Sequence, residues 1–312
     1  NGEQIIISKS TFDLISESIS DKVSFRDLGE RRLKDVIQPI KLFQIISSGL
    51  REDFPPLKTL DARPNNLPVQ LTNFIGREES MKSAKEFLNQ TRLLTMLGSG
   101  GVGKSRLALQ VGADMIDEFA NGVFIAELAP VNDPDFILQT LMNSFGFKDE
   151  SGKTAEEILK DHLKVKELLL IIDNCEHLIK ECAITVEMLL SNSINLKIIT
   201  TSRESLNCSG EKIYRVPSLS LPDVSVNNTP LQLSKYESVR LFIERAIAVN
   251  REFRVNNENA PALAEICFRL DGIPLAIELA AARIKVLSVE KISERLINRF
   301  SLLTGGKRTA LP

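Results

Sequence analysis

The sequence predicts an α/β fold, in which a parallel sheet covered by helices is followed by a smaller, all-α domain. Between residues 78 and 216, short and almost entirely apolar runs alternate with amphipathic stretches. This alternation is typical of parallel strands whose two faces are both buried beneath helices. From residue 233 onward only helical patterns occur. The length of 312 residues suits about two domains of this kind.

The composition is that of a globular protein and excludes several functions. Hydrophobic residues make up 43% of the chain and charged residues 26%, so a disordered or fibrous chain is not expected. With 39 basic and 41 acidic side chains, the net charge of −2 gives no broad basic field, and we expect no direct nucleic-acid binding. The longest strongly apolar run, 168–172, is far shorter than the ~20 residues of a membrane helix, so no membrane association is expected.

The four cysteines lack the CxxC spacing that is typical of zinc sites. Cys175 and Cys182 flank His177, which leaves a metal site as an alternative, but no second Cys/His cluster would complete four ligands. Reduced, buried thiols are therefore the main prediction. Since the N-terminus also lacks a secretory signal, the sequence favours a cytoplasmic protein.

Six segments are expected along the chain. Residues 1–48 predict a strand at 4–8, a helix at 11–19 and strands near 23–26 and 41–46, a piece too short to complete a core by itself. Residues 49–72 contain Pro55, Pro56, Pro64 and Pro68 and predict an extended linker. The α/β domain is expected at 73–217, a second linker at 218–230, the helical domain at 231–305 and the start of a truncated further domain at 306–312.

Helices and strands are expected to alternate in the α/β domain. Its predicted helices are 78–89, 104–118, 135–145, 154–163 and 176–191, and its strands are 93–97, 123–128, 168–172, 196–201 and 212–216. The helical domain predicts helices at 235–250, 261–270, 275–286 and 289–300. Because residues 275–286 are apolar nearly all round, we expect that helix to be buried and this domain to move as a rigid body.

The segment from Gly98 to Ser105 carries a phosphate-binding pattern. Its sequence GSGGVGKS fits G-x-x-x-x-G-K-[ST] at every required position, with an apolar strand before it and a helix after it. Glycines let successive backbone N–H groups face a phosphate, and the helix N-terminus adds partial positive charge. Lys104 is expected to reach the β- and γ-phosphates, and the Ser105 hydroxyl to bind Mg²⁺. The nucleotide-binding residues expected here are Gly98, Gly100, Gly101, Val102, Gly103, Lys104, Ser105 and Arg106.

A second G-K-T triplet, at residues 152–154, does not satisfy the same criteria. Gly146 lies six residues upstream of Gly152 instead of five, and a helical pattern precedes the triplet in place of a buried strand. We therefore predict a loop followed by a capped helix at this position.

Acidic residues follow the apolar run 168–172. Asp173, at the end of that strand, is expected to hold Mg²⁺ and to act in catalysis together with Lys104. Glu176 is a candidate for orienting the attacking water, although a glutamate in the first turn of a helix is also favoured by the helix dipole alone. His177 is interpreted as a packing or hydrogen-bonding residue instead of a base.

An arginine stands just after the next buried strand, at residues 196–201. At that position Arg203 is expected to sense the γ-phosphate or to stabilise charge during phosphoryl transfer. An ordinary surface arginine is the alternative interpretation.

Together these motifs resemble the nucleotide-binding module of STAND-type signalling ATPases, a group that includes NB-ARC proteins and many bacterial transcriptional regulators. The resemblance covers roughly residues 66–305 and is carried by four segments: NLP at 66–68 with FIGRE at 74–78, LLLIIDNCEH at 168–177, IITTSRE at 198–204 and LDGIPLAIEL at 270–279. The resemblance implies that Ile75 and Arg77 lie near the adenine and that Pro274 closes over it from the helical domain.

Two departures from the family pattern bear on activity. Many relatives have a second acid after the magnesium-binding aspartate, where this chain has Asn174, so slow hydrolysis is expected unless Glu176 serves. The family usually continues into a winged helix and a sensor or repeat region, whereas this chain stops at Pro312.

The N-terminal piece resembles a different family. Residues 1–48, especially GEQIIIS at 2–8 and RDLGERRLKD at 26–35, are similar to the C-terminal end of a class III adenylate or guanylate cyclase domain. The matching part contains no metal-binding aspartate pair, so no cyclase activity is expected of this chain.

The motifs and the resemblance together predict an ATP- or ADP-binding, Mg²⁺-dependent switch of a bacterial signalling or transcriptional regulator, with slow or partner-dependent hydrolysis. The implied partners are an adenine nucleotide, winged-helix and sensor domains, and a second copy of the chain in the ATP state. One alternative is a P-loop enzyme with robust intrinsic turnover, such as a motor ATPase or a kinase. The other is a scaffold that holds no nucleotide, against which Lys104, Ser105 and Asp173 argue.

Overall fold

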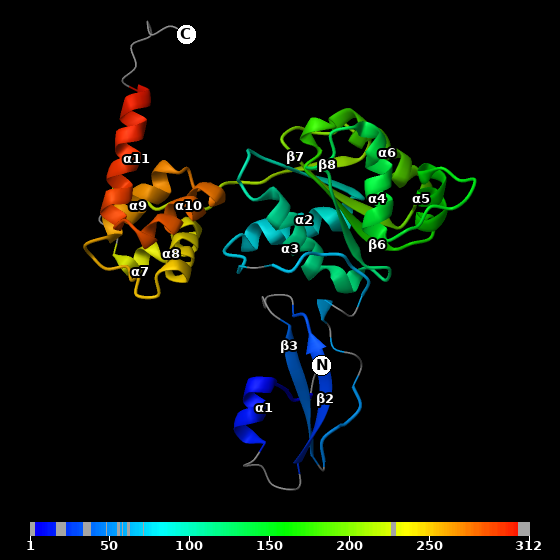
Figure 1. The fold of residues 1–312 in the computed structure, drawn as a ribbon, viewed down its shortest axis with the longest axis horizontal. Coiled ribbons are helices and arrows are strands. Elements are labelled where there is room, and N and C mark those ends of the chain that lie inside the picture. Colours follow the sequence, from blue (N-terminus) through cyan, green and yellow to red (C-terminus); the bar gives the residue numbers. More distant parts are fainter. Residues whose placement is uncertain are drawn as a thin grey trace, which may run out of the picture. The chain divides into compact units, whose positions relative to one another are not determined.

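The computed structural model describes residues 4–16, 23–33, 39–47, 49–54, 57, 59–60, 63–70, 72–225 and 229–304 (Figure 1). The chain divides into two compact units. The first comprises Asn1–Phe74, Ala84–Thr95 and Ala108–Ile213, and the second comprises Ile75–Ser83, Met96–Leu107 and Tyr214–Pro312. The expected start of a further domain at 306–312 and the end of the helix predicted at 11–19 lie outside the described residues.

The N-terminal piece is a small antiparallel sheet covered by one helix. Its elements are β1 (Ile6–Ser8), α1 (Lys9–Ile15), β2 (Val23–Arg31) and β3 (Ile40–Ser47), and the strand order is β1-β3-β2. Phe12 of α1 stacks on Phe43, with ring centroids 4.2 Å apart, and meets Phe25 edge-on at 5.0 Å. The element types expected from the sequence are thus confirmed, while the resemblance to a cyclase domain stays a prediction.

Part of the proline-rich segment is held along strand β5 (Val123–Glu127). Asn65 forms a parallel bridge with Val123, and the Asn66 side chain accepts from Ile125 N at 2.7 Å and donates to Ile125 O at 2.8 Å. The Pro64 carbonyl lies so close to Gly122 that a Cβ there would be 1.8 Å from its oxygen. The extended conformation agrees with the proline content, but the attachment to β5 does not follow from it.

The α/β part contains a five-stranded sheet in the order β5-β6-β7-β4-β8. The other four strands are β4 (Leu93–Leu97), β6 (Leu168–Asp173), β7 (Leu196–Ser202) and β8 (Glu211–Arg215). Strands β5 and β6 pair in parallel, as do β6 and β7, and Glu127 is opposite Asp173 at the carboxyl end. The predicted parallel α/β architecture is therefore confirmed.

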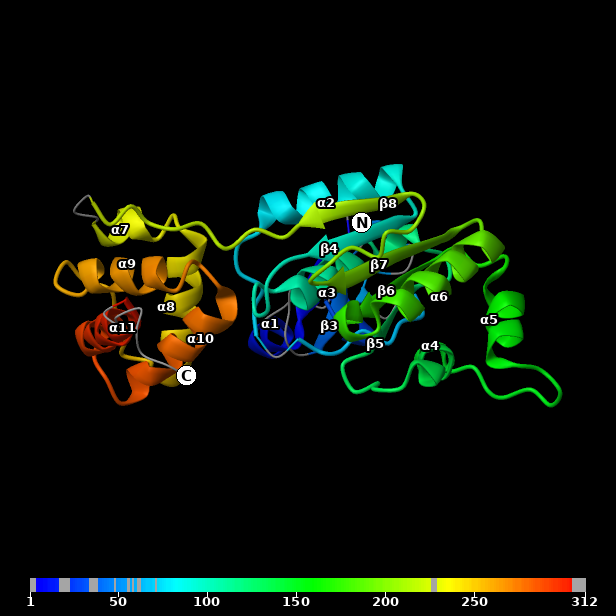
Figure 2. The same ribbon diagram turned by 90° about the horizontal axis from the view of Figure 1, so that it is seen from above.

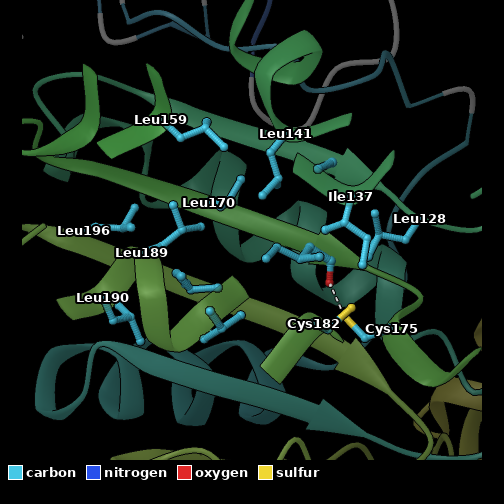
Figure 3. Packing of buried hydrophobic residues seen from close by; sticks show 14 of the residues in the cluster. Leu128, Ile137, Leu141, Leu159, Leu170, Cys175, Cys182, Leu189, Leu190 and Leu196 are labelled. Carbon is cyan, nitrogen blue, oxygen red and sulfur yellow. Dashed lines mark hydrogen bonds between the residues drawn. The ribbon is translucent and has the colours of Figure 1, made fainter. Parts of the chain in front are cut away.

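Strand β6, an interior strand of the sheet, is buried on both of its faces because helices pack against each. Leu168, Leu170 and Ile172 share a hydrophobic cluster with α4 (Ile137–Phe145), α5 (Ala155–Leu163) and α6 (Ile179–Asn192). Figure 3 shows Leu170 within this cluster, together with Leu141 of α4 and Leu189 of α6. On the opposite face, Ile171 packs on α3 (Lys104–Asp114), where a Cβ at Gly112 would be 2.9 Å from its Cδ1.

Several predicted helices are interrupted by short 3-10 turns. The helix expected at 104–118 ends at Asp114 and is followed by η2 (Ile116–Glu118). Turns η3 (Pro134–Phe136) and η4 (Cys175–His177) precede α4 and α6 respectively. Thr154 caps α5 as predicted, since its Oγ1 accepts from Glu157 N at 3.3 Å and its own N donates to Glu157 Oε2 at 2.7 Å. The triplet at 152–154 is thus a loop and helix cap.

The second unit contains the C-terminal helices shown in Figure 2. They are α7 (Pro230–Leu233), α8 (Glu237–Val249), α9 (Ala260–Arg269), α10 (Pro274–Ala281), η5 (Ala282–Lys285) and α11 (Val289–Thr304). The beginning of α2 (Glu78–Gln90) belongs to the same unit. Phe242, Leu263 and Ile277 are among the fully buried side chains of its core.

The prediction of an all-round buried helix at 275–286 is wrong. Helix α10 ends at Ala281, and Leu279 and Val286 are exposed by 62% and 73% of their surfaces. Ile277, Ala281 and Ile284 form the buried side. Apolar composition therefore overstated burial, because only one side of the helix meets the rest of the bundle.

All four cysteines are buried and none is in a disulfide. Burial raises the pKa of the Cys267 thiol to about 12 and that of Cys208 to about 11. Protonated, buried thiols are chemically unreactive, as expected from the sequence. Across the described ranges, every helix is too short or too polar to cross a bilayer.

Candidate functional site

The predicted P-loop has the strand, loop and helix that its pattern requires. Strand β4 ends at Leu97 and helix α3 begins at Lys104. Gly101 and Gly103 have φ angles of 76° and 94°, a left-handed conformation that glycine adopts without a steric penalty. The loop therefore curls back on itself, as a loop that encloses a phosphate with backbone N–H groups must.

The Lys104 side chain folds over this loop. It is 8% exposed, and its Nζ donates to the carbonyls of Gly98 at 3.0 Å and Ser99 at 3.3 Å. The ammonium group thus lies beside the loop that is expected to hold the phosphates. Because charged phosphate oxygens are stronger acceptors than carbonyls, this lysine is well placed to bind them.

The amino-terminal end of α10 contacts the P-loop within the second unit. Leu275 N donates to Gly101 O at 3.2 Å, and a Cβ at Gly101 would be 2.9 Å from the Leu275 Cβ. A Cβ at Gly103 would be 3.8 Å from Pro274 Cγ. Pro274, which the resemblance places over the adenine, is therefore adjacent to the phosphate loop.

Arg77 also reaches the P-loop from the segment that precedes α2. Its side chain is buried, and one terminal nitrogen, Nη2, donates to Val102 O at 2.5 Å. The other, Nη1, is buried without a hydrogen-bond partner. Burial lowers the pKa of this guanidinium, and the charge of Glu237 partly offsets that effect. A buried donor without a partner is costly, and an acceptor on a ligand would satisfy it.

Two other predicted nucleotide-binding residues have side chains directed elsewhere. Ile75 is partly buried against the hydrophobic core of the helical bundle. Arg106 donates from Nη1 to Glu278 Oε1 at 3.5 Å. The pKa of Arg106 is lowered mainly by burial and further by the nearby positive charge of Arg245. Nucleotide contacts of these residues remain predictions.

A second group of predicted site residues lies at the carboxyl ends of β6 and β7 in the first unit. Asp173 Oδ1 accepts from Thr201 Oγ1 at 2.6 Å, and the same hydroxyl accepts from Asn174 N at 2.9 Å. Thr201 thereby orients the Asp173 carboxylate, whose oxygens are of the type that Mg²⁺ prefers. Thr201 is not among the residues predicted from the sequence, although its hydroxyl two positions before Arg203 is a usable signal.

Glu176 and Arg203, predicted separately, form an ion pair. Arg203 Nε donates to Glu176 Oε1 at 3.0 Å, with side-chain exposures of 66% for the arginine and 18% for the glutamate. With its amide assigned so that nitrogen faces Glu176, Asn174 also donates to this carboxylate at 3.0 and 3.2 Å. Asn174 has a left-handed backbone, with φ of 66°, which asparagine adopts more readily than most residues. The glutamate is therefore held by two donors.

His177 is the last residue of the turn η4 and has a structural role in this arrangement. Its Nε2 lies 2.7 Å from Val131 O. The interpretation of His177 as a hydrogen-bonding residue is thus confirmed.

Comparisons with known proteins place similar chains in mycobacteria. The uncharacterized protein Rv0894 of Mycobacterium tuberculosis is 39% identical over 241 residues, which are 77% of this chain and 58% of that protein. The putative HTH-type transcriptional regulator Rv0890c of the same species is 40% identical over 227 residues, 73% of this chain and 24% of that protein. The chain thus spans little more than half the length of the first relative and about a quarter of the second.

Solved structures with a similar arrangement are more distant in sequence. The Walker-type ATPase PABY2304 of Pyrococcus abyssi is 16% identical, with a TM-score of 0.49 over 79% of this chain and 77% of that one. The STAND protein PH0952 of Pyrococcus horikoshii, which has a tetratricopeptide repeat sensor, is 18% identical, with a TM-score of 0.43 over 72% and 32%. No protein-family model matches the chain.

Proposed function

We propose that this chain is the nucleotide-binding switch module of a multidomain bacterial regulator, which binds ATP or ADP with Mg²⁺ and hydrolyses ATP slowly or only with a partner. The main support for this proposal is the P-loop itself, with Lys104 folded over it and the start of α10 in contact with it. The relative described as a putative transcriptional regulator supports the assignment to regulation.

The phosphates are assigned to the backbone N–H groups of Gly98–Ser105 and to Lys104. Ser105 and Asp173 offer the oxygen ligands that suit Mg²⁺, and Thr201 orients the aspartate. When bound, Mg²⁺ would neutralise charge on the phosphate oxygens. Arg77 has the buried, unpartnered nitrogen that the nucleoside half of the ligand would satisfy, and we assign Ile75 and Pro274 to the same half.

The way Glu176 is held supports the proposal of slow hydrolysis. A base or water-orienting carboxylate must reach the attacking water, but this one already accepts hydrogen bonds from Arg203 and Asn174. We propose that Arg203 senses the γ-phosphate and that Glu176 becomes available only after Arg203 leaves it. These contacts favour a switch over an enzyme with rapid intrinsic turnover.

Switching requires that ADP and ATP favour different arrangements of the chain. A change from 1:99 to 99:1 needs roughly 10⁴-fold differential affinity, or about 5.5 kcal/mol. Hydrogen bonds to charged groups contribute roughly 1.5–3 kcal/mol each, so a few γ-phosphate contacts are sufficient. Winged-helix and sensor domains, and a second copy of the chain in the ATP state, belong to the same proposal as partners of the whole protein.

The test compares the wild-type chain with Lys104→Ala by calorimetry with ADP and ATP in the presence of Mg²⁺. We expect the variant to bind both at least about tenfold more weakly, because it loses a charged phosphate contact. Unchanged affinity would refute the proposal. A steady-state ATPase assay on the wild type distinguishes the switch from an enzyme with rapid intrinsic turnover. Rapid multiple turnover without a partner would contradict a switch.

A further inference from the structure

The first residue of helix α8, Glu237, binds two irregular segments of the second unit at once. Its Oε1 accepts from Arg77 N at 2.5 Å, and its Oε2 accepts from Ser220 N at 3.0 Å. Both donors are backbone groups outside helices and strands. The two oxygens of one carboxylate therefore hold the turn before α2 and the segment that leads into the helical bundle.

The turn at Gly76 and Arg77 has an uncommon backbone that needs such support. Their φ angles are 70° and 67°, so two consecutive residues are left-handed and one of them is not glycine. Glu237 lies directly against the turn, because a Cβ at Gly76 would be 2.7 Å from its Cγ. No larger residue fits at position 76 while Glu237 stays where it is.

The Arg77 side chain depends on this turn for its direction. Its guanidinium is buried, donates to Val102 O in the P-loop and keeps Nη1 without a hydrogen-bond partner. A charge buried this far from water needs a nearby opposite charge, and the Glu237 carboxylate is bonded to the backbone of the same residue.

We propose that Glu237 is a positioning residue, whose carboxylate fixes the Gly76–Arg77 turn so that Arg77 presents its unpartnered nitrogen to an acceptor on the nucleoside half of the ligand. This inference rests on the proposed function. The inference goes beyond the proposed function because it assigns control of nucleoside affinity to Glu237, a residue of the helical bundle outside the phosphate loop. Phosphate affinity, which depends on Lys104 and the loop backbone, should be independent of Glu237.

We expect the Glu237→Gln variant to fold, because other contacts of the same segments remain. Ser220 stays attached to α8 through other atoms, since its Oγ accepts from the backbone N of residue 237 at 2.9 Å and its carbonyl accepts from Ser238 Oγ at 2.7 Å. A matched control is Glu78→Gln. Glu78 also joins the start of α2 to α8, through an exposed ion pair with Arg240 at 3.5 Å, but it does not bond to Arg77 N.

The experiment is calorimetric titration of the full chain with ADP and with inorganic pyrophosphate. For Glu237→Gln we expect about tenfold weaker ADP binding, the loss typical of a hydrogen bond to a charged group, and pyrophosphate affinity within about twofold of wild type. Glu78→Gln should leave both affinities unchanged. In an Arg77→Ala background, Glu237→Gln should produce no further loss of ADP affinity, because its effect passes through Arg77.

Failure of this inference can be told from failure of the proposed function. If wild type and Lys104→Ala bind ADP equally, or neither binds it, the proposed function is refuted. If Lys104→Ala weakens ADP binding but Glu237→Gln does not, the positioning role is overturned. Equal losses for ADP and pyrophosphate, or a full loss retained in the Arg77→Ala background, would also overturn it, because either result indicates a general structural effect.

Discussion

Replacing Glu278 with glutamine tests how the helix after the P-loop is joined to α10. Glu278 Oε1 accepts from Arg245 Nε at 2.9 Å and from Arg106 Nη1 at 3.5 Å. Arg245 is nearly buried, with 10% side-chain exposure, whereas Arg106 and Glu278 are exposed by 29% and 31%. Glu278→Gln keeps an acceptor of the same shape but removes the negative charge between the two arginines.

The magnitude follows from these distances and exposures. A hydrogen bond to a charged group contributes about 1.5–3 kcal/mol to stability, and a neutral acceptor retains roughly half of it. The long and partly exposed contact of Arg106 is worth about 0.2–1 kcal/mol. We therefore expect Glu278→Gln to lower the free energy of unfolding by about 1–2.5 kcal/mol, mostly through Arg245.

Arg106→Met provides the matched comparison at the other side of the contact. It removes a half-buried charge whose pKa is lowered by burial, so its unfolding free energy should change by less than about 1 kcal/mol. Urea denaturation followed by far-ultraviolet circular dichroism is the suitable assay, since the chain contains no tryptophan. A neutral effect of Glu278→Gln, or a larger loss for Arg106→Met, would refute this reasoning.

Two further predictions concern the Asp173 group and a buried thiol. Thr201→Val removes the hydroxyl that donates to Asp173 at 2.6 Å. We expect ADP binding by this variant to need about 10–100-fold more Mg²⁺, while ADP affinity in EDTA stays unchanged. An unaltered Mg²⁺ titration would contradict the role assigned to Asp173. Burial raises the pKa of Cys267 to about 12 from 9.0. The contribution of the protonated thiol to the free energy of unfolding should therefore be complete below pH 9 and be lost between pH 9 and 12. Alkylation at pH 8, located by mass spectrometry, should therefore modify Cys267 only in urea, and modification of the folded chain would show this thiol to be accessible.

The parts of the candidate site that can be predicted from the sequence are those encoded within a few consecutive residues. The P-loop, the apolar strand before Asp173 and the cap at Thr154 each depend on local backbone geometry, and all three have the predicted structure. The strands were found because burial on both faces of a parallel sheet produces apolar runs that no other short element shows as clearly.

The side-chain pairs within the site could not be found in this way. Thr201 and Asp173 are 28 residues apart, and Glu237 and Arg77 are 160 apart, so no local pattern links them. Each of the paired residues also has an ordinary local explanation, as a strand threonine or a first-turn glutamate. The error at Leu279 has the same origin, because apolarity indicates that a helix packs somewhere but not which of its sides remains exposed.

The second unit contains both the segments that the proposed function assigns to the nucleotide and the helices that would respond to it. The P-loop and the turn at Arg77 belong to the same compact unit as α8 and α10. A contact that moves Lys104 or Arg77 therefore acts on residues already bonded to the bundle, through Leu275 to Gly101 and through Glu237 to Arg77. In the proposed function the phosphates contact the P-loop, which is bonded to α10, and the nucleoside contacts Arg77, which is bonded to α8. Such direct contacts need no extended relay of side chains. It follows that phosphate and nucleoside should be separable inputs to the same bundle, which is the property that the ADP and pyrophosphate titrations measure.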